Sequence, residues 1–278
     1  MNDLIIEFFS EEMPASLIKN SAENLKDVLK KELLKQNYFF SNDECFYSPT
    51  RILIIIEGLK LDIDNSSDEI RGPKANAPIK ALEGFAKSMN TKLNLLVKKK
   101  TNKGEYYFFL KTKGVYDINQ SLSDIMEKVF SKFIWKKSMR WGDQTLRWVR
   151  PLKNIICLYN GKVIPFSLKE IKANNLFLFK ENLIEKMIKI KTKKEYFQSL
   201  KLINVEINHK KRREIIIREG RKLACKAKLN FSPDSELLEE VINLVERPYP
   251  LLAKFNKDFL YLPKEILITT DDAFESFY

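Results

Sequence analysis

The chain has 278 residues and a formal net charge of +12, and 44% of its residues are hydrophobic and 31% charged. This balance excludes an intrinsically disordered chain, and the length accommodates one large or two medium domains. Three widely spaced cysteines outside any CxxC pattern argue against a disulfide framework or a zinc site, and no apolar run approaches the roughly 18 residues that cross a bilayer. We therefore expect a cytoplasmic protein without a membrane partner.

The first part of the chain predicts a strand, a helix and a second strand. The apolar run 3–9 leads into a proline-containing turn, which is typical of a strand that feeds a helix. Apolar residues recur at steps of three and four from Pro14 to Gln36, which predicts an amphipathic helix. The β-branched run within 51–59 predicts a buried strand, and Gly72-Pro73 in the polar segment 62–76 predicts a loop or turn.

Strands and helices alternate along the middle of the chain. Periodicity predicts helices over 78–89 and 117–133 and strands over 105–110, 154–159 and 162–168. The last two strands flank Asn160-Gly161, a pair typical of a type I′ hairpin because both residues tolerate a positive φ.

Beyond residue 168 the pattern becomes basic and mainly helical, with the clearest helices over 208–228 and 236–245. We therefore expect an α+β fold in which mixed sheet elements with interleaved helices are followed by a basic helical segment. The expected domains are an amino-terminal α+β region, a basic and mainly helical region, and the truncated start of a further α/β segment, over 1–168, 169–228 and 229–278.

Positive charge is concentrated in residues 169–228, which hold 18 basic and 7 acidic side chains. The field of such a patch adds up over a Debye length of about 8 Å at physiological salt, so the patch suits a polyanion such as RNA. The candidate RNA-binding residues in it are Lys210, Lys211, Arg212 and Arg213. The alternative is a solvated basic surface in a chain that has 39 lysines and 10 arginines.

A second candidate interface lies between residues 135 and 151, which hold all three tryptophans and three of the ten arginines. Arginine offers a planar fork for phosphate or base edges, and tryptophan offers a stacking face, as in proteins that bind RNA loops. Arg140, Arg147 and Arg150 are therefore candidate RNA-binding residues.

The alternative assigns the same segment a structural role. Buried aromatic residues dominate protein cores, so Trp141 and Trp148 would fill the core. Two of the arginines, Arg140 and Arg147, would then cap carboxylates such as those of Glu7 or Glu11. The residue pattern leaves both interpretations open.

The residue pattern offers no complete catalytic site. His209 is the single histidine, which excludes HExxH sites and triads that use a second histidine, and no glycine-rich phosphate loop is present. Adjacent carboxylates such as Glu11-Glu12 diverge on a helix or strand and do not form an acid/base dyad. We expect no catalytic, metal-binding or cofactor-binding residue in this chain, and a structural role for His209.

Short motifs occur along the whole chain. The first, Glu7 to Pro14, fits the pattern E-[IF]-x-x-E-E-[LM]-P. The others are Ser48–Leu53, Arg71–Pro73, Lys137–Gly142, Arg147–Pro151, Leu237–Val241 and Val245–Pro248. In this order and spacing the motifs resemble those of the beta subunit of bacterial glycyl-tRNA synthetase.

The resemblance implies ATP-dependent attachment of glycine to tRNA(Gly) by a hetero-tetramer of two alpha and two beta subunits. It places amino-acid activation, with ATP and Mg²⁺, on the separate alpha subunit. It assigns tRNA binding and assembly to the beta subunit, which agrees with the lack of a catalytic motif in this chain.

The chain departs from the family pattern in two places. Residues 176–180 replace a basic HRF-like motif, and residues 271–278 replace a QKYF-like motif. Family members are also longer, with a later HD-like domain and a carboxy-terminal anticodon-binding domain, so we expect a fragment, a truncated product or a split subunit. The alternative function is a non-catalytic RNA-binding or interaction fragment left by truncation.

Overall fold

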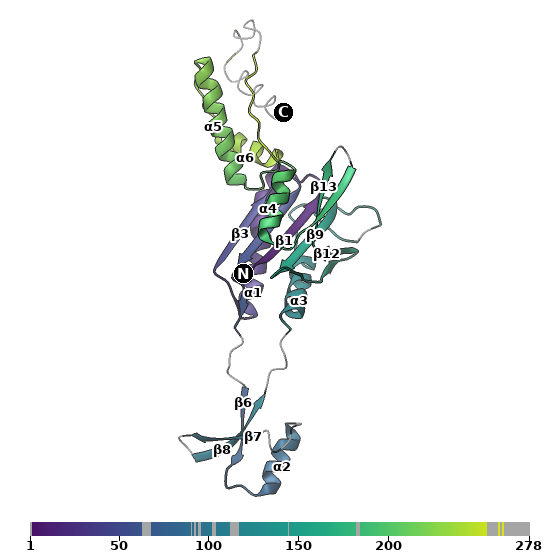
Figure 1. The fold of residues 1–278 in the computed structure, drawn as a ribbon, viewed down its shortest axis with the longest axis vertical. Coiled ribbons are helices and arrows are strands. Elements are labelled where there is room, and N and C mark those ends of the chain that lie inside the picture. Colours follow the sequence, from purple (N-terminus) through teal and green to yellow (C-terminus); the bar gives the residue numbers. More distant parts are fainter. Residues whose placement is uncertain are drawn as a thin grey trace. The chain divides into compact units, whose positions relative to one another are not determined.

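The chain folds into two compact units (Figure 1). The larger unit consists of Met1–Leu61 and Asn119–Tyr278, and the inserted unit consists of Asp62–Ile118. The boundaries of the inserted unit fall inside the region expected over 1–168. The structure, a computed structural model, describes residues 2–62, 68–89, 91, 93, 96–101, 104–111, 117–143, 145–181, 184–254, 261 and 263.

A mixed sheet forms the centre of the larger unit. Its strands in spatial order are β11 (Ser167–Leu168), β12 (Ile171–Asn174), β9 (Leu152–Tyr159), β1 (Leu4–Ser10), β4 (Arg51–Glu57) and β3 (Asn42–Tyr47). β1 is antiparallel to both β4 and β9, whereas β12 runs parallel to β9. The first strand of the chain is therefore a central strand, and all of its residues are buried.

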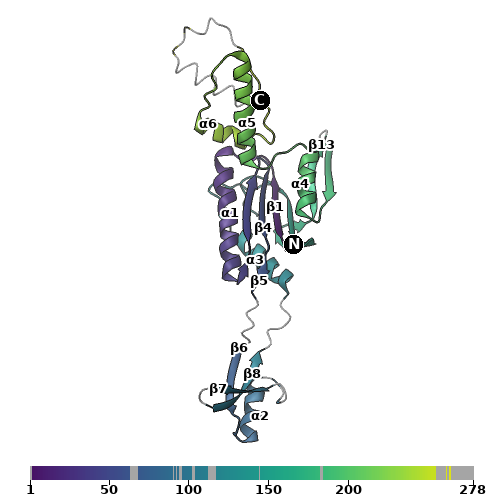
Figure 2. The same ribbon diagram turned by 60° about the vertical axis from the view of Figure 1, so that its left-hand side comes forward.

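Both faces of this sheet are covered by other elements of the larger unit (Figure 2). α1 (Ala15–Lys35) and α3 (Ile118–Ser131) cover one face. The other face is covered by α4 (Lys193–Leu202) and by the hairpin of β13 (Leu176–Glu181) and β14 (Ile184–Lys189). Because both faces are buried, the central strands are continuous apolar runs rather than alternating ones.

Successive side chains of β1 point to opposite faces of the sheet. Phe8 points toward α3, where its ring lies 4.8 Å from that of Phe130 between centroids. Ile5 packs in the opposite cluster with Phe177 of β13 and Tyr196 of α4. β1 therefore contributes side chains to the apolar packing on both faces of the sheet.

Most of the predicted elements are confirmed, among them the opening strand and helix. The type I′ hairpin is also confirmed: β10 (Lys162–Val163) pairs with β9, and Asn160 and Gly161 have φ values of 50° and 78°. The single strand expected over 162–168 is instead split into β10 and β11. Pro165 lies in the gap, where its missing N–H group costs no ladder hydrogen bond.

The loop expected over 62–76 is wrong for its second half. β6 (Asp68–Lys74) pairs with β8 (Gly104–Lys111), and the register shifts between Arg71 and Lys74. The Gly-Pro pair therefore occupies a β-bulge on an edge strand, a position that tolerates both residues. Gly72 is required there because a Cβ atom would collide with the ring of Phe85.

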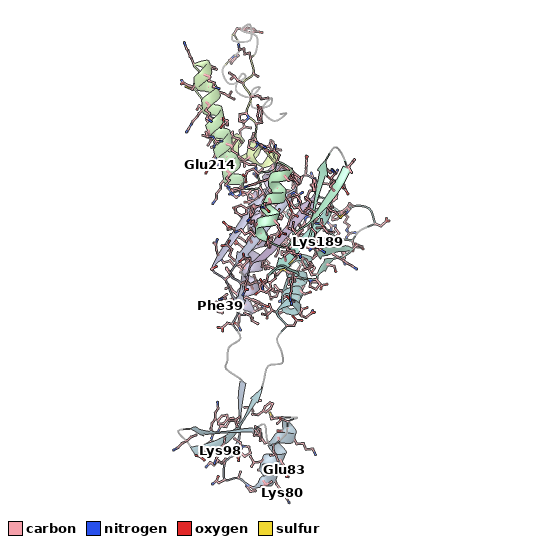
Figure 3. All side chains as sticks on the ribbon, viewed as in Figure 1. Phe39, Lys80, Glu83, Lys98, Lys189 and Glu214 are labelled. Atoms are coloured by element: carbon pink, nitrogen blue, oxygen red, sulfur yellow. The ribbon has the colours of Figure 1, made fainter. Side chains whose placement is uncertain are left out.

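The inserted unit is a three-stranded antiparallel sheet with one helix. β8 is its central strand, between β6 and β7 (Leu96–Thr101), and α2 (Ile79–Ser88) packs on β6. Figure 3 labels Lys80 and Glu83 on α2 and Lys98 on β7.

The basic region expected over 169–228 contains β12, β13 and β14 as well as two helices. The second helix is α5 (His209–Ala227), and α6 (Ser235–Leu244) follows it. Two further short strands, β2 (Tyr38–Phe39) and β5 (Lys60–Leu61), pair with each other.

The motif over 271–278 lies outside the described residues. Among the described helices, none is long and apolar enough to span a bilayer.

Candidate nucleic-acid interface

α5 carries the first candidate cluster. The side chain of Asn208 caps the helix by accepting hydrogen bonds from the backbone N–H groups of Lys210 and Lys211, at 3.0 and 3.3 Å. Lys228 ends the helix in the left-handed conformation. The cap fixes the first turn, and from this turn the side chains of Lys210 and Lys211 extend into solvent.

Arg212 has no exposed surface, although the sequence placed it among the RNA-binding candidates. Its Nε atom donates to the carbonyl of Ile242 in α6 at 2.8 Å. Its Nη1 atom donates to the carbonyls of Tyr47 and Glu206, at 2.9 and 2.7 Å. Burial lowers the pKa of this guanidinium to about 10. These bonds tie α5 to α6 and to the edge of the central sheet, and they leave Arg212 unavailable to a surface ligand.

Arg213 is half-buried and forms an ion pair with Glu239 of α6. Four consecutive basic residues thus divide into two that face solvent and two that hold α5 in place. The helical period explains the division, because side chains at adjacent positions point in different directions around the axis.

The tryptophans of the second candidate segment serve mainly as core residues. Trp135 and Trp148 are buried, and their rings lie 4.6 Å apart in a T-shaped pair. Phe8 of β1 lies 5.1 Å from Trp148, so this pair extends the central core. Trp141 is half-buried. Trp148 has the structural role that the alternative assigned to it, and its buried ring offers no open stacking face.

The arginines of this segment lie differently from its tryptophans. Arg140 and Arg147 are exposed, next to the paired backbones of Met139 and Trp148. Arg150 is half-buried and donates to the carbonyl of Val149 at 3.2 Å. A loop that is anchored by buried tryptophans therefore presents two guanidinium groups to solvent.

The carboxylates proposed as caps for these arginines pair with other residues. Glu11 pairs with Lys153 at 2.7 Å. Glu7 is completely buried and accepts hydrogen bonds from Arg51 and from the hydroxyl of Tyr196, both at 2.6 Å. These bonds contradict the expected capping of Glu7 or Glu11 by Arg140 or Arg147.

The buried pair of Glu7 and Arg51 was missed by sequence reasoning. The guanidinium of Arg51 also donates to the carbonyl of Leu178 and lies 4.1 and 4.4 Å from the ring centroids of Phe9 and Phe177. Burial lowers the pKa of Arg51, but Glu7, together with Tyr196 and Glu246, raises it above its usual value. The signal was available: one acid and one base each stand inside an apolar strand, where a charge needs a partner.

Glu246 brings another pair of motifs together. Its carboxylate accepts hydrogen bonds from the hydroxyls of Ser48 and Thr50, the first at 3.3 Å. Its backbone carbonyl accepts from the N–H group of Glu206 at 2.9 Å. The motifs around residues 7, 48–51 and 246 thus converge on the end of the sheet where α5 and α6 are attached.

His209 has a structural role in the first turn of α5. Its ring stacks on Tyr47 with 4.1 Å between centroids and 7° between planes. Burial, together with the positive charges of Arg212 and Lys210, lowers the pKa of His209 to about 4. The neutral imidazole is therefore the form that packs at this position.

This shift predicts an acid-dependent loss of stability. The unfolded histidine has a pKa of about 6.5, so between pH 6.5 and 4 the unfolded chain binds the proton and the folded chain does not. Stability is fully present above pH 6.5 and falls as the pH approaches 4. We expect the melting temperature of the wild type to fall more steeply over this window than that of His209→Phe, which keeps the stack. Parallel pH profiles of the two proteins would contradict the assignment.

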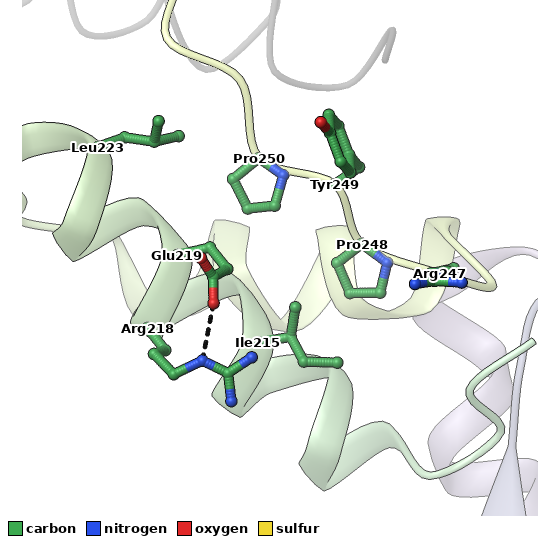
Figure 4. Close-up of a pocket in the computed structure, with 8 residues that line it drawn as sticks. All are labelled: Ile215, Arg218, Glu219, Leu223, Arg247, Pro248, Tyr249 and Pro250. Atoms are coloured by element: carbon green, nitrogen blue, oxygen red, sulfur yellow. Dashed lines mark hydrogen bonds and ion pairs between the residues drawn. The ribbon is translucent and has the colours of Figure 1, made fainter.

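An open pocket of about 370 Å³ lies between α5 and the segment that follows α6 (Figure 4). Its carboxylate, Glu219, accepts from Arg218 at 2.8 Å and from Lys222 at 3.0 Å. These two bases lower the pKa of Glu219. The pocket thus presents a carboxylate that is paired with two basic side chains. Its lining residues are Ile215, Arg218, Glu219, Leu223, Arg247, Pro248, Tyr249 and Pro250.

No group of three or more histidine, cysteine, aspartate or glutamate side chains able to hold a metal occurs among the described residues. What the described surface offers instead is positive charge on rigid supports. Lys210 and Lys211 extend from a capped helix, and Arg140 and Arg147 from an anchored loop. Exposed lysine and arginine side chains on fixed supports are the groups that contact phosphate oxygens in protein–nucleic acid complexes.

Comparison with known proteins adds a family match. The family model described as glycyl-tRNA synthetase beta subunit matches residues 4–273. The chain is 34% identical to the glycine–tRNA ligase beta subunit of Rickettsia felis over 100% of its own length and 42% of that protein. It is 33% identical to the corresponding protein of Paracoccus denitrificans, over 100% of the chain and 41% of that protein. The chain spans less than half the length of these curated relatives.

Proposed function

The chain belongs to the glycyl-tRNA synthetase beta-subunit family, and we propose that it contributes tRNA binding and assembly to ATP-dependent charging of tRNA(Gly) with glycine. The observation that carries this proposal is the family match over nearly the whole chain. Exposed bases on fixed supports, Lys210 and Lys211 on α5 and Arg140 and Arg147 on the loop, supply the chemistry that RNA phosphates require.

The proposal includes a division of labour with a second polypeptide. An alpha subunit activates glycine with ATP and Mg²⁺, and two alpha and two beta subunits form a cytoplasmic hetero-tetramer. In that assembly this chain docks on the alpha subunit and holds the tRNA.

The α5 lysines are tested by the salt dependence of tRNA(Gly) binding. The slope of log affinity against log salt falls by about 0.7–0.9 for each phosphate contact that is removed. We expect Lys210→Gln with Lys211→Gln to flatten the slope by up to about two units. The matched control, Lys162→Gln with Lys201→Gln, removes the same charge at exposed positions elsewhere in the larger unit. Equal slopes for the two variants would show that Lys210 and Lys211 do not contact tRNA and belong to an ordinary solvated surface.

The arginine loop is tested by exchange to lysine, which keeps the charge and removes the fork. If Arg140 and Arg147 grip RNA, the lysine variants keep their melting temperature and lose about 1–3 kcal/mol of tRNA binding for a base contact. Arg150→Lys serves as a comparison, since its guanidinium is half-buried against a backbone carbonyl. Variants that change neither melting nor binding would exclude an RNA contact for this loop.

A second candidate is a non-catalytic RNA-binding or interaction fragment, which the same exposed bases, Lys210, Lys211, Arg140 and Arg147, would serve. Reconstitution with an alpha subunit separates the two. Glycylation of tRNA(Gly) that requires this chain supports the beta-subunit role, whereas tRNA binding without any stimulation of charging supports the fragment.

A further inference from the structure

The inserted unit holds a second concentration of positive charge. Residues 71–113 carry 11 basic and 2 acidic side chains, and the remainder of residues 1–168 carries 16 and 18. The whole unit, residues 62–118, carries 11 basic and 7 acidic side chains, and five of the acids lie outside 71–113, near its two ends. Four of these acids lie over 62–69, so the charge changes sign at Arg71.

The basic residues come from three different elements of the unit. β6 contributes two, α2 two and β7 three consecutive ones. All seven are exposed except Lys99, which is half-buried. They are Arg71, Lys74, Lys80, Lys87, Lys98, Lys99 and Lys100.

The two acids within 71–113 neutralise little of this charge. Glu105 pairs with Lys98 at 2.9 Å, and both side chains are about half exposed, so the pair is screened by water. Glu83 is exposed on α2. The positive charge concentrated over 71–113 attracts polyanions and speeds their encounter.

The aromatic residues of the unit indicate which part of a polyanion it contacts. Tyr106 is buried beneath the guanidinium of Arg71, which lies 3.6 Å from its ring centroid, and Phe108 is also buried. Tyr107 and Phe109 are half-buried. Among the aromatic side chains of this unit whose exposure the structure describes, none is exposed. The part of the unit that the structure describes therefore offers charge without a fully exposed aromatic ring, which suits phosphate contacts and not base readout.

Protection of an edge strand accounts for part of the pattern. β7 lies at the edge of its sheet, and lysines on edge strands hinder pairing with other chains. The same role accounts for Lys74, because β6 is the other edge strand. It does not explain Lys80 and Lys87, which lie on a helix.

We propose that the inserted unit binds the phosphate backbone of RNA, as a contact separate from the one on α5. In the context of the proposed function its ligand is a double-helical stem of tRNA(Gly). The chemistry itself is independent of sequence, because phosphates are common to every RNA.

The test measures the salt dependence of binding by the full chain with two probes, tRNA(Gly) and a double-stranded RNA of unrelated sequence. The variant of the inserted unit and its control each replace four exposed lysines by glutamine. The first carries Lys74→Gln, Lys80→Gln, Lys87→Gln and Lys100→Gln, and the second carries Lys31→Gln, Lys35→Gln, Lys162→Gln and Lys201→Gln.

We expect the inserted-unit variant to flatten the slope by about two to four units with both probes, and the control to change it less. Bound RNA should also protect Lys80 and Lys87 from acetylation in the unmodified chain. Equal slopes for the variant and the control overturn the proposal. A second result would also overturn the proposal. If the variant aggregates, as seen by increased light scattering, while its slope of log affinity against log salt equals that of the wild type, the lysines serve edge protection.

The two proposals fail in distinguishable ways. Loss of the duplex-RNA slope in the inserted-unit variant, with no preference of the chain for tRNA(Gly), supports the phosphate site and contradicts the proposed function. A slope that depends on Lys210 and Lys211 and not on the inserted unit supports tRNA binding by α5 and overturns the inference drawn here.

Discussion

Replacing Glu7 by alanine is expected to lower the free energy of unfolding by about 3–5 kcal/mol, because it leaves the guanidinium of Arg51 buried without its counter-charge. The hydroxyl of Tyr196 loses its acceptor in the same step. Urea denaturation of the purified chain measures the change. The m value should stay constant, since the variant exposes the same surface when it unfolds.

Two further variants separate charge from packing. Glu7→Gln keeps an oxygen for Arg51 and Tyr196, so it should cost less than Glu7→Ala. Glu7→Leu combined with Arg51→Met replaces the ion pair by apolar side chains and should recover part of the loss. A cost of Glu7→Ala below about 1 kcal/mol would show that the pair contributes no more than an exposed one.

Arg212→Met is expected to cost at least about 3 kcal/mol. It leaves the carbonyls of Tyr47, Glu206 and Ile242 without their donor, and an unpaired buried acceptor costs about 1–3 kcal/mol. The loss should appear first at α5, as faster hydrogen exchange and earlier proteolysis of that helix, because Arg212 joins it to α6.

The matched control stands one residue further along the same helix. Arg213→Met breaks the half-exposed pair with Glu239 and should cost less than about 1 kcal/mol. Urea denaturation of the two variants gives the comparison. Equal costs would mean that burial does not distinguish the two arginines, contrary to the hydrogen bonds of Arg212.

Local pattern predicted the elements that depend on local chemistry. The spacing of Leu25, Leu29 and Leu33 predicted α1, because a helix with one buried face must repeat every three or four residues. Asn160-Gly161 predicted its hairpin because the turn needs two positive φ values. In both cases the determinant lies within a few residues of the element.

Elements that depend on distant partners were not predicted. β6 contains Gly72-Pro73, which is typical of a loop, and it is a strand because β8 pairs with it across a bulge. β13 and β14 lie in a stretch expected to be mainly helical, and they are held by the buried side chains of Phe177 and Phe179 against the sheet. The pairing of β6 with β8 and the packing of the β13–β14 hairpin on the sheet depend on residues distant in sequence, which leave no local signal.

The candidate interface was predicted by residue type and corrected by burial. Lys210, Lys211, Arg140 and Arg147 are exposed as a surface role requires, and whether they bind RNA stays a prediction. Arg212 was indistinguishable from its neighbours by composition. Its role depends on three carbonyls contributed by separate segments, which no spacing within α5 reveals.

The insertion between β4 and β9 has a consequence for the order in which the protein folds. A ribosome adds about 5–20 residues per second, and β1 and β4 leave it well before β9. The sheet therefore has an open edge on β1 while the whole inserted unit is being synthesised, and it closes when Leu152–Tyr159 arrives. Strand pairing between segments so far apart in sequence is slow. The edge of β1, Leu4–Ser10, is thus open to pairing with other chains until β9 has been synthesised.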